Sequence, residues 1–486
     1  QVIWDQAFRS ARKESTSLTE PHITTMVRLM APILLAGSAA ALGGEDATSL
    51  VQVKLQRGDG RDQPYYWAGK NGDAMRTGNA AFPMPVDLQS GPAWSWHEGQ
   101  NGLVRAAPLI DGDKSIYLSS IAGNVYKFSP DGEVLWKHKE GVQIPEVPAI
   151  MGGALYATNT RGEVFALNMS TGKRLWKKKA GKASAGDTWS MTAADGMVIA
   201  ALSSNGGVAN DYISALDAKD GSVRWSFKPQ VPVYNSLSAV RGSNLVLSDL
   251  NGRPYRLNLA DGSLIWKSEP GLGVVEEPSF STGGAVIGPN GLVYVTSNSK
   301  KDGVERGHVT AFQFSDGKML WRQGTDYQAN NAPAVGRLGA DGPLAVVVGV
   351  GPNPDMPDPI MQLTKTAPKS EKRARVMALD AVTGRVIWRH ELPMWHGWAA
   401  GDTMSHVCLP DSFGNPAISG DGTVFVGFQS GRFYGINDRN HDGNVNTSEV
   451  TSYNFSNAFQ GSPGLAPGML VATPCNGLHV FRAKSG

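Results

Sequence analysis

The chain has 486 residues, and its 45 Lys and Arg nearly balance its 43 Asp and Glu, which leaves a formal net charge of +2. That total argues against a partner recognised mainly by charge, such as nucleic acid or an acidic membrane. Hydrophobic residues (41%) can fill a large core, which excludes general disorder, while 58 Gly and 29 Pro favour a turn-rich β protein over long helices.

The amino-terminal part of the chain has the features of a secretory signal. Met26 is the first methionine, and a lone Arg, a short apolar stretch and a small-residue segment follow it. We therefore predict a signal peptide over residues 26–41, with residues 1–25 as an upstream, non-native leader. The alternative is a genuine leader joined to an uncleaved anchor. Residues 42–85 are expected to form an extension without an assigned function. The mature protein is expected to be secreted or lumenal, with no membrane span.

From residue 86 onward one sequence pattern recurs. Clear copies run from Gly162 to Trp176 and from Arg375 to Trp388: an alternating strand, a turn containing Gly, and a second strand that ends in a hydrophobic residue and Trp. Period-2 alternation with Asp-Gly or Thr-Gly at the reversal predicts an antiparallel hairpin. The remaining copies place an aromatic residue at the same point: Trp136, Trp225, Trp266, Trp321 and, in the seventh copy, Phe455.

Another pair of strands precedes each hairpin and starts near a small-residue segment that often carries Pro. Four strands per repeat, spaced by about 40 residues, are typical of one propeller blade. The last fragment, residues 462–481, supplies three strands, and residues 92–96 are expected to supply the fourth. The sequence therefore predicts an all-β fold over residues 86–486. This fold is an eight-bladed β-propeller of four-stranded antiparallel blades, and the N-terminal strand closes the last blade.

The pattern Ala-Leu-Asp-x-x-Thr-Gly-x-x-x-Trp, as at residues 378–388, resembles the pyrroloquinoline-quinone-like (PQQ-like) repeat of the quinoprotein alcohol dehydrogenase-like superfamily. The resemblance covers about residues 86–485. It implies an eight-bladed ring in which the repeated Trp docks onto the neighbouring blade, so the Trp array belongs to the core rather than to a cofactor cage. The superfamily contains quinone-dependent enzymes and a noncatalytic outer-membrane assembly lipoprotein, so the fold does not decide the function.

Residues 438–449, within the seventh copy, match the calcium-loop pattern D-x-[DN]-x-[DN]-G-x5-E. Calcium prefers about six to eight oxygen ligands, and Gly443 allows the sharp turn of such a loop. The flanking residues are strand-like, which predicts an EF-hand-like loop between the third and fourth strands of a blade and a structural calcium site. A metal-free hairpin turn is the alternative. The expected ligands are Asp438, Asn440, Asp442, Asn444, Asn446 and Glu449.

A quinone site in the central channel is the main catalytic alternative. The resemblance implies that dehydrogenases hold a calcium-bound quinone with Glu, Asn, Asp and a stacking Trp. Near the expected starts of the innermost strands this chain offers Glu146, Trp189, Glu276 and Asn331 as cofactor-binding candidates for pyrroloquinoline quinone. The chain departs from the enzymes because it lacks paired adjacent cysteines and long insertions. Motifs of acyl transfer, zinc proteolysis and nucleotide hydrolysis are also absent, so no catalytic residue is assigned.

Long connections near the sixth and seventh blades carry the densest aromatic and imidazole cluster, formed by Trp395, His396, Trp398 and Asp402. Long loops on a rigid scaffold often bind ligands, so we expect a protein or small-molecule partner on this face. A carbohydrate or peptide that stacks on the two Trp is a further option, and a loop that packs its own aromatics is the structural alternative.

The two cysteines, Cys408 and Cys475, are expected to form a disulfide because the chain is predicted to be secreted. The principal hypothesis is a secreted or lumenal, monomeric propeller that acts as a noncatalytic binding or assembly scaffold with a structural calcium site. We expect no nucleic-acid partner. The alternative is a PQQ- and calcium-dependent dehydrogenase of alcohols or sugars.

Overall fold

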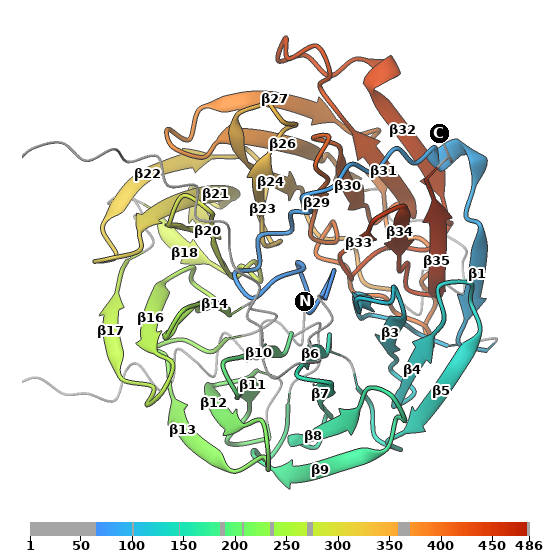
Figure 1. Ribbon diagram of the computed structural model, residues 1–486. Coiled ribbons are helices and arrows are strands. Elements are labelled where there is room, and N and C mark those ends of the chain that lie inside the picture. Colours follow the sequence, from blue (N-terminus) through green and yellow to red (C-terminus); the bar gives the residue numbers. More distant parts are fainter. Residues whose placement is uncertain are drawn as a thin grey trace, which may run out of the picture. The chain divides into compact units, whose positions relative to one another are not determined.

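The computed structural model describes residues 65–99, 102–144, 146–184, 190–206, 209–233, 238–269, 276–357 and 370–483. The chain divides into two units, Gln1–Asp62 and Gln63–Gly486, and every described residue belongs to the second. In that unit, the described residues form eight antiparallel sheets of four or five strands around a common centre, and one further sheet of two strands (Figure 1). The predicted all-β, eight-bladed propeller is therefore confirmed. No helix in the described part of the chain is long and apolar enough to cross a membrane.

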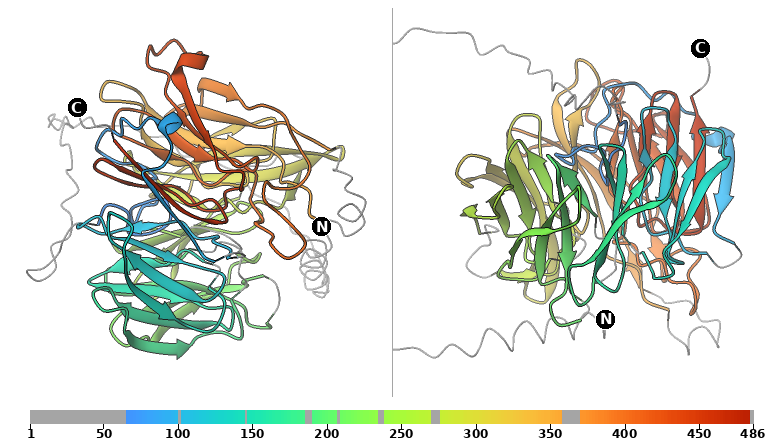
Figure 2. Two further views of the ribbon diagram at one scale, coloured as in Figure 1. Left: turned by 90° about the vertical axis from the view of Figure 1, so that its right-hand side faces the viewer. Right: turned by 60° about the horizontal axis from the view of Figure 1, so that its bottom comes forward.

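Each blade has four main strands, and two side views show the blades packed around the ring (Figure 2). The innermost strands, from blade 1 to blade 8, are β2 (Leu109–Ile110), β6 (Ala149–Met151), β10 (Thr192–Ala194), β14 (Ala239–Arg241), β19 (Ala285–Ile287), β23 (Ala334–Arg337), β29 (Ala417–Ile418) and β33 (Gly464–Ala466). The second strands are β3 (Ile116–Ser119), β7 (Ala154–Thr158), β11 (Met197–Leu202), β15 (Asn244–Ser248), β20 (Leu292–Lys301), β24 (Leu344–Val350), β30 (Val424–Gly427) and β34 (Met469–Ala472).

The third strands are β4 (Asn124–Phe128), β8 (Glu163–Asn168), β12 (Tyr212–Asp217), β16 (Pro254–Asn258), β21 (Val304–Gln313), β26 (Arg375–Asp380), β31 (Arg432–Ile436) and β35 (Gly477–Arg482). The outermost strands are β5 (Val134–Lys139), β9 (Arg174–Lys179), β13 (Val223–Phe227), β17 (Leu264–Lys267), β22 (Met319–Gly324), β27 (Val386–Glu391), β32 (Val450–Asn454) and β1 (Trp94–His97). Outside this plan lie β18 (Glu277–Ser279), β25 (Glu371–Lys372), β28 (Trp395–His396) and the short 3-10 helices η1 (Leu88–Ser90) and η2 (Thr447–Glu449).

The two ends of the chain close the ring in blade 8. Strand β1 pairs antiparallel with β35, so that Trp94 lies opposite Val480 and His97 opposite Gly477. The predicted closure by the segment around residues 92–96 is confirmed. Between blades, apolar side chains such as Val164 of β8 pack in shared clusters.

The repeated Trp docks onto the next blade, as the resemblance implied. The indole Nε1 of Trp136 in blade 1 donates a hydrogen bond of 2.9 Å to the Met169 carbonyl of blade 2. Its ring lies against Gly172, whose φ is +66° and whose added Cβ would come within 2.8 Å of the indole. Trp94 makes the equivalent 2.9 Å bond to the Pro130 carbonyl. Blade 8 thus has its own docking Trp, which the sequence pattern missed because it lies at the other end of the chain.

In blade 7 the sequence pattern placed Phe455 at the docking position, and this is wrong. The docking Trp of blade 2 lies opposite Ala166, and the corresponding residue of blade 7, Gly435, lies opposite Thr451. The next blade joins β35 to β1 from opposite chain ends, so it offers no tight turn for an indole to cover. Phe455 instead packs on His479, with ring centroids 4.5 Å apart.

The two faces of the ring are distinct. We name the face at which the innermost strands begin, marked by Glu146 and Asn331, the loop face. The opposite face carries the hairpin turns between first and second and between third and fourth strands, such as those at Gly153 and Gly172, and we name it the turn face. This alternation follows from the antiparallel order of each blade.

Residues 65–82, which we name the central segment, close the middle of the ring at the turn face (Figure 1). The backbone carbonyls of this segment accept amides from the innermost strands of six blades, and these amides would otherwise face the channel unpaired. The bonds are Ile110 N to Trp67 O, Ile150 N to Ala68 O, Val240 N to Ala74 O, Ile287 N to Met75 O, Val335 N to Thr77 O and Ile418 N to Gly78 O, all 2.7–3.0 Å. We expected residues 42–85 to form an extension outside the propeller, whereas residues 65–82 are an integral part of it.

Arg76 extends the same contacts to blade 3 from a fully buried position. Its guanidinium donates to the carbonyls of Met191 (2.6 Å), Lys70 (2.9 Å) and Ser238 (3.2 Å), and to the hydroxyl of Thr192 (2.7 Å). Burial lowers the pKa of Arg76 to about 10, so the group still carries its charge at neutral pH. A single side chain thus ties blades 3 and 4 to the central segment.

Candidate functional site

Glu146 is a buried acid at the loop-face end of the channel. It lies just before β6 and is 2% exposed. One carboxylate oxygen accepts the backbone amide of Thr158, whereas no described residue donates to Oε2. Burial raises the pKa of Glu146 well above its usual range, against the opposing effect of the Thr158 hydrogen bond. The environment therefore favours the protonated form of this carboxyl group more than water does, and Oε2 has no hydrogen-bond partner among the described residues.

Three small hydroxyl side chains elsewhere at the loop face repeat this feature. Ser190 precedes β10, Ser462 precedes β33, and Thr473 follows β34, so all three lie at the loop-face ends of inner strands. Their hydroxyl oxygens are buried, and none has a partner among the described residues. Buried polar groups of this kind are usually satisfied by water or by a ligand. In the sequence these residues are distinguished only by their small polar side chains at strand ends, a signal too weak to predict them.

Asn331 also lies at the loop face, but it braces neighbouring blades. Its Nδ2 donates to the carbonyls of Phe413 (2.8 Å) and Gly414 (3.4 Å) in the connection to blade 7. The backbone carbonyl of Asn331 accepts a hydrogen bond of 2.9 Å from the hydroxyl of Thr296. Glu146 belongs to blade 2 and Asn331 to blade 6, which stand on opposite sides of an eight-bladed ring. The two residues therefore come from opposite blades, and Asn331 is engaged by blade 7.

Glu276 does not line the channel, because the inner strand of blade 5 begins later than the sequence pattern predicts. The inner strand that contacts the central segment is β19. The residue of blade 5 that corresponds to Glu146 and Asn331 is therefore Gly283 and not Glu276. Glu276 lies before β18, which pairs with the far end of the long strand β20. Its carboxylate forms an ion pair of 2.8 Å with Arg322 on the outermost strand β22. The last quinone candidate, Trp189, lies outside the described residues.

The predicted partner cluster lies in an ordered excursion between blades 6 and 7. Strand β28 pairs with β25, which brings Trp395 opposite Lys372. The indole of Trp395 donates to the Trp398 carbonyl at 2.8 Å, and the ammonium of Lys372 contacts the Asp355 carboxylate at 2.9 Å. Both Trp side chains are half-buried, while His396 is exposed. The excursion therefore packs part of its own aromatic surface and presents the remainder to solvent.

Asp402 and the cysteines anchor the end of this excursion. Asp402 Oδ1 accepts the amide of Cys408 at 2.8 Å, and burial raises the pKa of Asp402 to about 7 despite the opposing influence of Arg105. Cys408 and Cys475 form a disulfide with Cα atoms 5.7 Å apart. Both cysteines are buried. This bond joins the connection before blade 7 to the connection between the second and third strands of blade 8.

The loop over residues 438–449 projects outward between β31 and β32, as the strand-like flanks predicted (Figure 1). Asp438 and Glu449 are buried, and their carboxylates accept backbone amides of the loop. Glu449 accepts Arg439 N and Asn446 N at 3.0 Å each, and Asp438 accepts Gly443 N at 3.1 Å. In the described residues, no group of three His, Cys, Asp or Glu is placed to hold a metal ion. Amide hydrogen bonds are what hold this loop together here.

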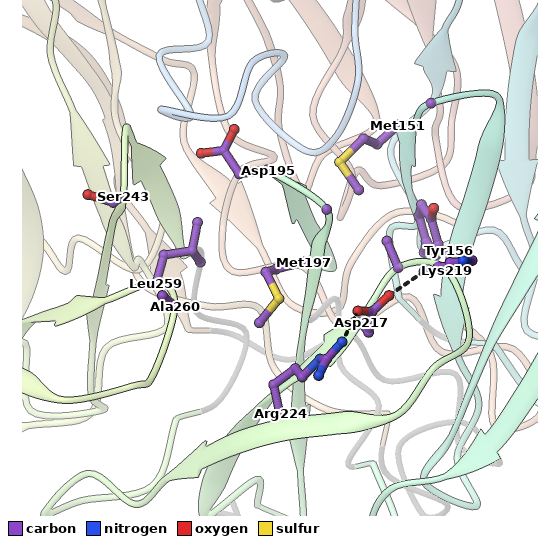
Figure 3. A pocket seen from close by; sticks show the side chains of 13 residues that line it. Met151, Tyr156, Asp195, Met197, Asp217, Lys219, Arg224, Ser243, Leu259 and Ala260 are labelled. Carbon is purple, nitrogen blue, oxygen red and sulfur yellow. Dashed lines mark hydrogen bonds and ion pairs between the residues drawn. The ribbon is translucent and has the colours of Figure 1, made fainter. Parts of the chain in front are cut away.

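A groove on the turn face was not anticipated from the sequence. It spans blades 2 to 4, has a volume of about 840 Å³, and is open to solvent. Figure 3 shows Met151, Met197 and Leu259 around it, with the ion pair between Asp217 and Arg224 at its edge. These residues come from successive turns of the repeat, so the groove follows from the way neighbouring turns diverge.

Comparison with known proteins links the chain to two kinds of propeller protein. Polyvinylalcohol dehydrogenase from Sphingopyxis sp. (strain 113P3) is 23% identical over 436 residues, which cover 83% of this chain and 56% of that protein. Outer membrane protein assembly factor BamB is 24% identical over 255 residues in Yersinia pestis, covering 50% of this chain and 56% of that protein. In Burkholderia pseudomallei it is 23% identical over 360 residues, covering 72% and 79%. The chain thus spans little more than half the length of the first two relatives.

Solved structures have the same fold. BamB from Moraxella catarrhalis aligns with a TM-score of 0.57 at 16% identity, covering 80% of this chain and 99% of that one. Quinohemoprotein alcohol dehydrogenase from Comamonas testosteroni aligns with a TM-score of 0.58 at 14% identity, covering 87% and 81%. A family profile described as outer membrane protein assembly factor BamB matches residues 121–273 and 210–473, more than half of the sequence. The chain therefore belongs to this family of PQQ-like repeat propellers.

Proposed function

We propose that the protein is a noncatalytic binding or assembly scaffold that works outside the cytoplasm and holds a partner on the loop face of blades 6 and 7. The observation that carries the proposal is the excursion around Trp395 and Trp398. Strand pairing, the Lys372–Asp355 ion pair and the disulfide hold it in place, so its exposed surface is preorganised. The similarity to the assembly factors supports the same function.

The disulfide also supports the proposed location. Such bonds persist in oxidising compartments and are rare in the cytosol. Together with the predicted signal peptide over residues 26–41 and the relatives described as outer membrane assembly factors, it favours an extracytoplasmic protein. Mature protein isolated from its host should begin near residue 42, which N-terminal sequencing can determine.

A photo-crosslinking experiment tests the scaffold. A benzophenone amino acid at His396, which is exposed beside both Trp, should give a discrete adduct in cells of the native host. The same amino acid at Lys301, exposed on the long hairpin of blade 5, serves as the control. Replacement of Trp395 and Trp398 by Ala should remove the adduct and leave the melting temperature within a few degrees. No adduct at 396, or equal adducts at both positions, would refute the proposed site.

A quinone-dependent dehydrogenase is the second candidate, favoured by the unpaired oxygen of Glu146 and by the similarity to polyvinylalcohol dehydrogenase. The described residues fit the group poorly. Glu146 is a single acid, Asn331 lies across the ring, and Glu276 is paired with an outer strand. Titration with pyrroloquinoline quinone and calcium, followed by dye reduction with alcohols and sugars, decides between the candidates. Saturable binding with turnover that Glu146→Gln abolishes would favour the enzyme.

We further propose that the loop over residues 438–449 binds calcium as a structural ion. The oxygen-bearing side chains at the expected spacing support this, and Asp438 and Glu449 are already directed at the loop interior. Calcium would replace part of the amide hydrogen bonding that these carboxylates now receive.

A further inference from the structure

One position of the repeat has opposite charges on different sides of the ring. It lies three residues after the docking Trp, at the loop-face end of the outermost strand or just beyond it. The three consecutive blades 1 to 3 have Lys139, Lys179 and Lys228 there, whereas blades 4 and 6 have Glu269 and Glu391. All five side chains are exposed. The near-neutral total charge of the chain therefore conceals a basic side.

Two further exposed cations lie in the same region. Arg161 is in the connection between β7 and β8, and Lys182 follows β9. The ammonium of Lys179 donates to the backbone carbonyls of both residues, so the three residues lie close together and the ammonium charge is not neutralised by these bonds. We name Lys139, Arg161, Lys179 and Lys182 the basic arc. Neither Lys139 nor Lys182 has an ion pair with any carboxylate in the described ranges.

The nearby acids are occupied by other cations. Glu140 and Glu163 both bind Lys177, at 3.0 and 3.2 Å. The side chain of Glu140 is fully buried, and although burial opposes the effect, hydrogen bonds from His138 and Lys177 lower its pKa to about 2. These carboxylates are therefore not available to balance the basic arc. The local surface keeps a clear positive excess.

The shape of the arc fits an extended, flat partner. Lys139 and Lys179 end the outermost strands β5 and β9, which follow each other along the rim of the ring (Figure 1). The other ends of these strands expose Val134 (42%), Leu135 (47%) and Leu175 (55%). These aliphatic side chains lie at the opposite ends of β5 and β9 from Lys139 and Lys179, so the lysines alone form the proposed contact. Exposed lysines suit the headgroup region of a bilayer with anionic lipids, where cations meet phosphates.

We propose that the basic arc docks the propeller on the surface of a membrane that contains anionic phospholipids. The inference goes beyond the scaffold function and does not depend on it, because the Trp395 excursion belongs to blades 6 and 7, across the ring from blade 2. The contact is electrostatic, so it weakens as salt rises.

Vesicle co-sedimentation of the full chain tests the proposal. Vesicles of phosphatidylcholine with about one-third phosphatidylglycerol are compared with pure phosphatidylcholine at low and high salt. The test variant is Lys139→Gln/Lys179→Gln/Lys182→Gln. The control variant, Lys300→Gln/Lys301→Gln/Arg389→Gln, removes the same charge from exposed positions of blades 5 and 6. All proteins carry the same N-terminal residues, so the comparison isolates the arc.

We expect the test variant to lose roughly two orders of magnitude in apparent affinity for the anionic vesicles, since each lysine at such a surface contributes substantially. The control variant should bind within about threefold of the original protein. Equal binding by both variants, or equal binding to neutral vesicles, would overturn the proposal. Arc-dependent binding to soluble polyphosphate without binding to vesicles would also overturn it, because the partner would then be a soluble polyanion.

Discussion

The turn face and the loop face are built from the same repeat, yet they use their polar groups in opposite ways. At the turn face, the central segment receives the amides of the inner strands, and Arg76 donates to four oxygens. At the loop face, Glu146, Ser462 and Thr473 bury oxygens that have no described partner. Trp67 Nε1 of the central segment is also buried without a described partner, so the contrast is one of degree. The turn face holds the ring together through its backbone bonds, whereas the loop face buries a carboxyl and hydroxyl groups that a ligand or water could engage.

Arg76→Ala should cause the largest loss of stability among the substitutions at the turn face. The substitution leaves the carbonyls of Met191 and Ser238 without their donor in a buried site, and removal of one partner from such a buried charged network costs about 3–5 kcal/mol. Urea denaturation followed by fluorescence measures the loss. Arg385→Ala, at an exposed turn position, is the control and should change the free energy of unfolding by less than about 0.5 kcal/mol. A loss below about 1 kcal/mol for Arg76→Ala would mean that the central segment contributes little to stability.

Gly172→Ala tests the docking of the Trp at the same face. Gly172 and Gly153 both have positive φ, at +66° and +76°, so Ala strains the backbone at either position. Only at Gly172 would the new methyl group meet an indole, at 2.8 Å from Trp136, whereas Gly153 has open space. We expect Gly172→Ala to cost about 1–3 kcal/mol more than Gly153→Ala, because overpacking adds to the strain. Equal losses in thermal melts would show that the indole moves aside freely.

Glu146→Gln should stabilise the protein, whereas the two turn-face substitutions destabilise it. The reason is that the ionised carboxyl group of Glu146 weakens the folded state. The folded-state pKa of Glu146 lies above the ordinary value of 4.5, so the folded protein binds this proton more tightly than the unfolded chain. The original protein therefore loses stability as pH rises above about 4.5 toward the raised pKa, and Gln removes that loss. We expect the variant to melt at a higher temperature at pH 8 and to approach the original protein near pH 4.5.

Glu163→Gln is the matched control for this pH dependence. Hydrogen bonding from Asn159 and the nearby Lys177 lower the pKa of Glu163, so its ionised form favours the folded state. That stability is present above the ordinary pKa and disappears as pH falls through the lowered value. The control variant should therefore melt slightly lower than the original protein at pH 8. If Glu146→Gln also melted lower at pH 8, the unpaired acid would not be a source of instability.

The blades could be predicted from sequence because each is a local pattern: an alternating hairpin with a turn glycine and a Trp, repeated along the chain. The central segment could not, because it is bound mainly through backbone carbonyls, which impose no residue pattern on residues 65–82. Glu276 was misplaced because Pro278 imitates the proline of other inner strands. The long hairpin of β20 and β21 displaces the true inner strand to Ala285–Ile287.

The candidate sites were predictable only where function depends on residue type at short spacing. The loop over residues 438–449 and the cluster at Trp395 are contiguous in sequence, and both lie where the repeat pattern put them. By contrast, the relation between Glu146 and Asn331 depends on which blades face each other across the ring. The basic arc could not be recognised in the sequence because Lys139 and Lys179 are separated by a full repeat. They become neighbours only when the blades pack into a ring.

Calcium should produce the smallest effect on the turn face, which includes the loop of blade 7. If calcium binds the folded protein alone, its addition should raise the melting temperature by a few degrees relative to chelator. Glu449→Gln removes a carboxylate that faces the loop interior and should abolish the shift. Asp131→Asn, in the corresponding turn of blade 1, should retain it because Asp131 is exposed and pairs with Arg482. If the melting temperature were the same in calcium and in chelator, the amide hydrogen bonds alone would stabilise the loop, and calcium would have no structural role there.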